Sequence, residues 1–136
     1  MKFQIITVGK KHDKDLENLI LDFEKRIKKN FDLSWHILKS EDDKDKDVQK
    51  KKESEKILEF LKKEISSNSF VILLDEKGKE KSTKELSNLF EEKMNRGIDK
   101  IIFIIGGAFG VEEKISEKAN LILSLSKLVF PHQIVR

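Results

Sequence analysis

The sequence predicts a three-layer α/β domain on a mostly parallel sheet of five strands, and three observations predict it. Short runs of apolar β-forming residues alternate with helical segments along the chain, as in βαβ units. Two of these runs are apolar on both faces, as buried parallel strands are. The length of 136 residues fits one domain, residues 1–136, and no internal repeat or second domain is visible.

Five short runs bounded by turn-forming residues are the predicted strands. They are residues 3–8, 33–38, 70–74, 101–105 and 121–125. The third and fourth runs should lie in the middle of the sheet because both of their faces are apolar. The second run alternates apolar and polar residues, which predicts an edge strand.

Four helices are predicted between the strands from apolar residues spaced at about one helical turn. Their stripes are Leu16, Leu19, Ile20, Phe23 and Ile27; Ile57, Leu58, Leu61 and Ile65; Leu86, Leu89, Phe90 and Met94; and Val111, Ile115 and Ala119. The third helix should begin at the capping box Ser82–Glu85 and end at Arg96–Gly97, with the glycine just past its last turn.

The charge pattern does not by itself indicate a nucleic-acid binder, since the net charge is only +3. Residues 39–56 hold seven lysines and seven acidic residues, so we interpret them as a solvated linker and helix start. Lys77, Lys79 and Lys81 lie in the predicted turn after an apolar strand, where parallel sheets usually bind ligands. These lysines could equally belong to a ligand site or to a solvated loop.

Compartment and membrane contact follow from composition. Cysteine is absent and the first residues form a strand pattern rather than a secretory signal, which predicts a cytoplasmic protein. The longest apolar run is well short of the roughly 20 residues that span a bilayer, so no membrane role is expected.

Several reaction classes are disfavoured by the residues present. The histidines His12, His36 and His132 are far apart in sequence and have no metal-binding spacing, so no metal site is expected. No nucleophile motif occurs. The turn Gly106–Gly110 is neither a dinucleotide fingerprint nor a P-loop, which argues against hydride transfer and NTP hydrolysis.

Three predicted strand ends could together form a small pocket built mostly of backbone groups. They are Leu74–Lys79, Gly106–Gly110 and Ser126–His132. Backbone N–H and C=O groups there could read the edge of an adenine, while Leu74, Leu128 and Phe130 could contact its faces. This arrangement favours an adenosyl cofactor.

Four motifs along the chain resemble the RlmH family of SPOUT-class RNA methyltransferases. They are Val8-Gly9-Lys10, Leu74-Asp75…Gly78-Lys79, Ile105-Gly106-Gly107…Gly110, and Leu125-Ser126…Phe130-Pro131-His132…Val135-Arg136. The resemblance implies a homodimer that uses S-adenosylmethionine to methylate N3 of a pseudouridine in 23S rRNA of the assembled ribosome. It also implies a C-terminal trefoil knot. The cofactor contacts it implies are Leu74, Gly107, Ser126, Lys127, Leu128, Val129, Phe130 and Pro131.

An imide N3–H is a poor nucleophile near neutral pH, so a group must assist its deprotonation or stabilise the anion. Candidates in this chain are His132 as a base and Arg136 or Lys127 as cationic stabilisers.

Members of the RlmH family continue beyond the position of Arg136 through another helix of about five turns. The resemblance assigns that helix to the knot and the dimer interface. Without it, apolar faces of the sheet and of the first helix would be exposed, at about 1.5 to 3 kcal/mol for each large side chain. We therefore expect the 136-residue chain to dimerise weakly or to be poorly soluble.

Two other functions remain open. One is a non-catalytic ribosome- or RNA-binding module of the same fold, inactive through loss of that helix. A measurement of cofactor binding would distinguish this module from the enzyme. The other is a small-nucleotide-binding domain in which Gly106-Gly107 is a phosphate-binding bend. The motif after Leu125 argues against the second, because a phosphate binder does not need it.

Overall fold

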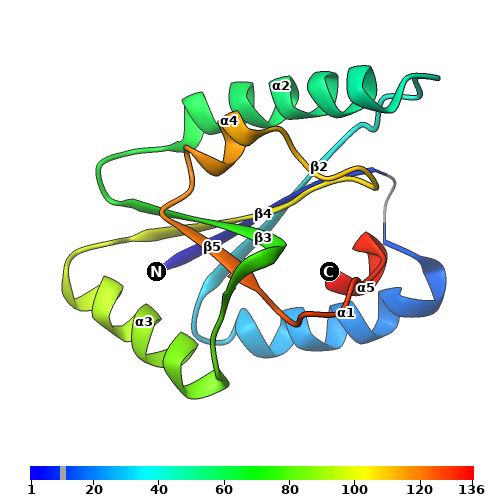
Figure 1. Cartoon of the computed structure of the whole chain (residues 1–136). Coiled ribbons are helices and arrows are strands. Elements are labelled where there is room, and N and C mark those ends of the chain that lie inside the picture. The colour runs from blue at the N-terminus through cyan, green and yellow to red at the C-terminus, as the bar shows by residue number, and fades with distance from the viewer. Residues whose placement is uncertain (10–11) are drawn as a thin grey trace.

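A single sheet of five parallel strands forms the centre of the computed structural model, which describes residues 1–9 and 12–136 (Figure 1). The strands are β1 (Lys2–Val8), β2 (Asp32–Leu38), β3 (Ser69–Glu80), β4 (Lys100–Ile105) and β5 (Leu121–Ser124). Their order is β2-β1-β4-β3-β5. The predicted five-stranded α/β fold is confirmed: β4 is central with β3 beside it, and β2 is an edge strand.

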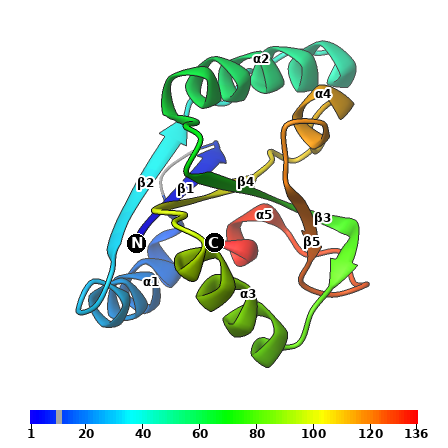
Figure 2. The same cartoon turned by 90° about the vertical axis from the view of Figure 1, so that its left-hand side faces the viewer.

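Helices cover both faces of the sheet, which completes the three layers. They are α1 (Lys14–Ile27), α2 (Lys46–Glu64), α3 (Thr83–Asn95), α4 (Glu113–Ser116) and α5 (His132–Val135). Figures 1 and 2 show α2 and α4 on one face and α1, α3 and α5 on the other. The short helix α5 was not predicted from the sequence.

Side chains at the helix N-termini explain where the helices begin. Asp13 accepts a hydrogen bond of 2.9 Å from the backbone N–H of Asp15 at the start of α1, and Asp45 does the same for Asp47 at the start of α2. The predicted capping box of α3 is present: Ser82 N–H donates to Glu85 Oε2 (2.7 Å), and Glu85 N–H donates to Ser82 Oγ (3.2 Å).

The two faces of the sheet are packed to different extents. Between the sheet and the α2/α4 layer, Ile6, Ile57 and Ile104 are fully buried within a large apolar cluster. On the opposite face α1 buries no residue completely, and its Leu19 and Phe23 are 55% and 51% exposed. The predicted helix is therefore confirmed, but its apolar stripe is only partly covered.

Two segments differ from the sequence prediction. The helix start predicted within residues 39–56 is present, because α2 begins at Lys46, but the segment is not wholly solvated, because Gln49, Glu53 and Ser54 are buried. Lys77 and Lys79 lie within a strand rather than a turn, because β3 continues to Glu80. After Leu74 pairs with Leu123, the register shifts and Lys79 pairs with the same residue of β5.

Candidate functional site

A cavity of about 900 Å³ lies where β3, β4 and β5 end on the same edge of the sheet. Its walls come from the three segments that the sequence predicted would meet: residues 74–77, which lie within β3, the turn Gly106–Gly110, and the chain that follows β5. Parallel strands place their carboxyl ends together, and the crevice outside them is the usual ligand site of an open α/β sheet.

Seven of the eight predicted cofactor contacts line this cavity. They are Leu74, Gly107, Ser126, Leu128, Val129, Phe130 and Pro131. Lys127 is exposed and is not among the residues that line it. Lys10, part of the first motif, lies outside the described residues.

The glycine turn brings backbone atoms to the cavity with little side-chain cover. Gly110 N–H donates a hydrogen bond of 3.1 Å to Gly107 O, which closes the turn. Glu112 N–H donates to the buried Ser54 Oγ on α2 at 2.9 Å, which fixes the start of the next helix. The turn is therefore closed by its own backbone, and the chain just after it is held by Ser54, which lies outside the cavity.

The segment after β5 is shaped by two serines. Ser124 Oγ donates to Ser126 O at 2.7 Å, and Leu128 N–H donates to Ser126 Oγ at 3.1 Å. The three residues that follow Lys127 keep their apolar side chains exposed: Leu128 is 69%, Val129 74% and Phe130 43% exposed. These side chains supply apolar surface beside exposed backbone, which suits a flat aromatic ligand.

The two candidate catalytic side chains, His132 and Arg136, meet beside Gly9 at the end of β1. Gly9 has φ of +128°, and a Cβ on it would lie 3.5 Å from Arg136 Nη2 and 3.7 Å from His132 Nε2. A residue with a side chain would be strained at this positive φ, while its Cβ would be in ordinary van der Waals contact with both groups. The short helix α5 therefore reaches back to the first strand of the sheet.

His132 is half-buried, and its environment lowers the pKa of its imidazole below the ordinary value of 6.5. Burial is the largest cause and the charge of Arg136 adds to it, while the negative charge of Glu53 opposes them. Burial also lowers the pKa of Arg136. A neutral imidazole that lines the cavity can accept a proton, so the geometry permits His132 to act as a base.

Sequence reasoning missed the contribution of α2 to this site. Lys50 lines the cavity, Glu53 packs against Gly107, and Ser54 binds the backbone of Glu112. A signal was present, because Gln49, Glu53, Ile57 and Leu61 recur every four residues and so share one helix face.

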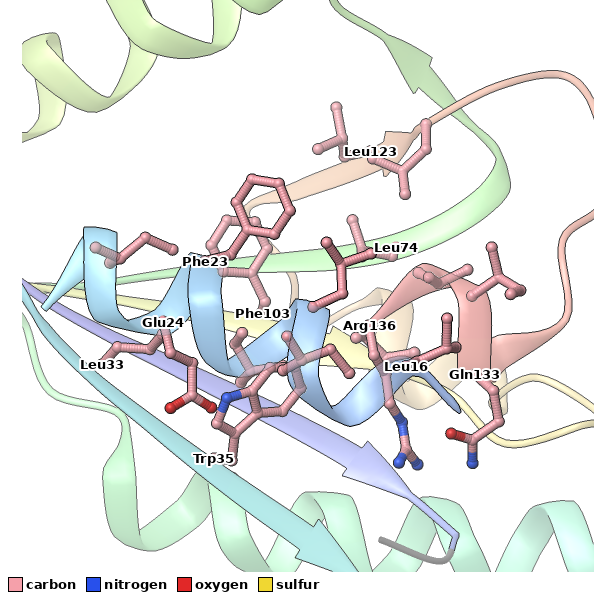
Figure 3. A pocket seen from close by; sticks show the side chains of 18 of the residues that line it. Leu16, Phe23, Glu24, Leu33, Trp35, Leu74, Phe103, Leu123, Gln133 and Arg136 are labelled. Carbon is pink, nitrogen blue, oxygen red and sulfur yellow. The ribbon is translucent and has the colours of Figure 1, made fainter. Parts of the chain in front are cut away.

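A second cavity, of about 450 Å³, lies on the other side of the sheet along α1. Figure 3 shows apolar side chains of α1 and the sheet around it, with Gln133 and Arg136 extending from α5 at one end. We call this the α1 groove, defined by Leu16, Leu19, Ile20, Phe23, Phe103 and Ile134.

The described part of the chain has neither a metal site nor a membrane-spanning helix. Within residues 1–9 and 12–136, no group of three or more His, Cys, Asp or Glu side chains is placed to hold a metal ion. None of the helices described is both long and apolar enough to cross a membrane.

Comparison with known proteins places this geometry in a family. The family described as "Predicted SPOUT methyltransferase" matches residues 1–136, the whole chain. The chain belongs to the SPOUT methyltransferase family. The five-stranded, all-parallel sheet with helices on both faces is consistent with the SPOUT fold.

Relatives of this SPOUT methyltransferase carry a more specific name. "Ribosomal RNA large subunit methyltransferase H" from Clostridium botulinum strain Kyoto is 40% identical over all of this chain and 87% of its own length. The protein of that name from Christiangramia forsetii is 36% identical over all of this chain and 86% of its own. "Ribosomal RNA large subunit methyltransferase H 2" from Caldanaerobacter subterraneus is 35% identical, with 92% of its length covered.

Proposed function

We propose that this chain is an S-adenosylmethionine-dependent methyltransferase that acts on N3 of a pseudouridine in 23S rRNA of the assembled ribosome. The observation that carries the proposal is the cavity at the carboxyl edge of β3, β4 and β5, which is lined by residues of three of the four motifs of the resemblance in a chain of this family. The names of the relatives support rRNA as the substrate class. Action on the ribosome makes the protein cytoplasmic.

The residues around the cavity fit an adenosyl cofactor. Gly107 lines the cavity, and because a Cβ there would lie 2.7 Å from Glu53 Oε2, glycine lets the turn pack directly against α2. Leu74, Leu128 and Phe130 offer apolar surface for the two faces of an adenine. Bound there, S-adenosylmethionine would supply an electrophilic methyl group.

The chain's own residues would then position the acceptor and manage its proton. Methyl transfer is an in-line displacement, so holding the acceptor nitrogen in line and excluding water are the main requirements. His132, neutral near pH 7, would accept the N3 proton, and Arg136, within the same cluster, would stabilise the anion formed. Neither cation lines the cavity, since Arg136 lies at the end of the α1 groove and Lys127 is exposed. The closeness of Arg136 to His132 beside Gly9 makes it the stronger candidate for that second role.

We also propose that the enzyme works as a homodimer. The α1 groove supports this, because Leu19, Phe23 and Ile134 leave 55%, 51% and 57% of their surface exposed on one side of the sheet. Exposed apolar surface of this kind commonly marks an interface. Burial of these side chains against a partner would also cover the face of the sheet that α1 covers incompletely.

A non-catalytic RNA-binding module remains the second candidate. The extension of β3 favours it, because Lys77 and Lys79 are exposed beside the cavity, where they could contact phosphates. Such a module would bind ribosomes without needing S-adenosylmethionine.

Calorimetric titration of the chain with S-adenosylmethionine, followed by methylation assays on ribosomes that lack the modification, tests the proposal. We expect saturable cofactor binding, and transfer of labelled methyl to 23S rRNA with mass spectrometry placing it on N3 of a pseudouridine. Ribosome binding without cofactor binding would favour the non-catalytic module. Cofactor binding with methylation of a different base would overturn the proposed target but not the enzyme class.

A further inference from the structure

One face of α2 contacts the glycine turn through polar side chains. Lys46 Nζ lies 5.4 Å from the ring centre of Phe109, and Ser54 Oγ accepts from Glu112 N–H. Between them Glu53, which is 2% exposed, packs against Gly107. The helix therefore contacts the turn at Gly107 and Phe109, and the chain just after the turn at Glu112.

The Glu53 carboxylate is held in a fixed orientation. Gln49 Nε2 donates a hydrogen bond of 3.0 Å to Glu53 Oε1, and Ser40 Oγ donates a longer one of 3.5 Å to the same atom. Both donors are neutral, so they orient the carboxylate without cancelling its charge. A buried charge is costly, and an amide of the same shape would fill this space at lower cost.

The glycine turn lies directly against this carboxylate, with the cavity on its other side. A Cβ on Gly107 would lie 2.7 Å from Glu53 Oε2 and 3.2 Å from Oε1. Gly107 itself lines the cavity. Because the carboxylate is buried, its field is screened less than that of a surface charge and reaches a bound ligand across one layer of backbone.

We propose that Glu53 is a positioning residue of the cofactor site, which fixes the Gly106–Gly110 turn and makes the site favour a cationic ligand over its neutral analogue. This inference rests on the proposed function. S-adenosylmethionine carries a positive sulfonium, whereas its demethylated product, S-adenosylhomocysteine, is a neutral thioether of nearly the same shape. A negative charge behind the turn therefore strengthens binding of the substrate cofactor relative to the product.

The electrostatic environment of His132 supports the direction of this field. Glu53 raises the pKa of the His132 imidazole, against the effects of burial and of Arg136. The carboxylate thus favours positive charge at a group that lines the same cavity.

Titration calorimetry with both ligands tests the inference. In Glu53→Gln, which keeps the shape and removes the charge, affinity for S-adenosylmethionine should fall about three- to tenfold, with S-adenosylhomocysteine nearly unaffected. Glu53→Asp, which keeps the charge, should retain the native ratio of affinities. The matched control Glu55→Gln, an exposed site two residues along α2, should match the native chain.

A purely structural role for Glu53 would weaken both ligands equally, and that result would overturn the inference while leaving the proposed function intact. Failure of the native chain to bind either ligand would defeat both. If Glu53→Gln does not fold, as judged by circular dichroism, the native chain still provides a test. Sinefungin, which carries an ammonium group near the sulfonium position, should then bind more tightly than S-adenosylhomocysteine, and weaker or equal binding would overturn the inference.

Discussion

The guanidinium Nη2 of Arg136 donates a hydrogen bond of 3.4 Å to the carbonyl oxygen of Val8, 128 positions earlier in the chain. This contact joins α5 to the last residue of β1. It also places the cation beside His132, since both side chains approach Gly9. The cluster that the proposed mechanism needs is therefore assembled from the two ends of the sequence.

Replacement of Arg136 by Ala should raise the pKa of His132, because the charge of Arg136 lowers it in the native chain. An NMR titration of the imidazole ring protons measures this shift directly. Methyl transfer to ribosomes should fall by at least about tenfold through loss of anion stabilisation. Arg136→Lys keeps the charge and should leave the pKa of His132 nearly native. An unchanged pKa in the Ala variant would show that the two groups are not electrostatically coupled.

Stability should decrease as the pH falls through the range in which histidine titrates. The pKa values of both His12 and His132 are lowered from 6.5, mainly by burial and then by Arg136, while Glu24 and Glu17 partly oppose this at His12. The unfolded chain then binds more protons than the folded one, so the free energy of unfolding is highest above the ordinary pKa and is lost as the pH falls toward the lowered values. Thermal melting between about pH 8 and pH 5 checks this. The double variant His12→Gln, His132→Gln should show a flatter dependence, and a curve as steep as the native one would assign the loss to other groups.

Gly107→Ala should destabilise the chain by about 1 to 3 kcal/mol, because its methyl group would overlap the fixed carboxylate of Glu53. Affinity for S-adenosylmethionine should fall as well, since the turn must shift. Urea unfolding and calorimetry measure the two effects. Combining it with Glu53→Ala should restore part of the stability, because the second change creates space for the methyl group. Additive losses in the double variant would show that the two residues do not press on each other.

Ser54→Ala should lower the free energy of unfolding by about 1 kcal/mol or more, because it leaves the N–H of Glu112 without its acceptor. Ser54 is fully buried. Ser87→Ala, at an exposed position on α3, is the matched control and should have little effect. Equal denaturation midpoints for the two variants would mean that the contact between α2 and α4 contributes little to the fold.

The fold could be predicted from the sequence because its strands are encoded locally. A run that is apolar on both faces, such as Ile101–Ile105, is typical of a buried strand in a parallel sheet. The capping box at Ser82 marks the start of a helix from local sequence alone. The three strand ends of the cavity followed from the same reasoning, since parallel strands end on one edge.

The four-residue spacing of Gln49, Glu53, Ile57 and Leu61 could have predicted a buried face of α2, but not its contact with the glycine turn, because that contact depends on which residues face one another across elements. In the sequence, Glu53 is one acidic residue among many in a charged segment, and only packing against Gly107 distinguishes it. The meeting of His132 with Gly9 is equally non-local. The extension of β3 was missed because Lys77 and Lys79 have no strand propensity, and backbone pairing with β5 holds them there.

The α1 groove supplies a test of the proposed dimer. Leu19 and Phe23 line it and are half exposed, whereas Leu21, 42% exposed, lies outside it on the same helix. If the groove is buried between two copies, Leu19→Glu or Phe23→Glu should shift the chain to the monomer in light scattering, because a charge would be buried in the interface. Leu21→Glu should leave the mass unchanged. A native chain that stays monomeric at all concentrations would contradict the dimer. In that case the groove would be exposed to solvent, and the Glu variants should be more soluble than the native chain.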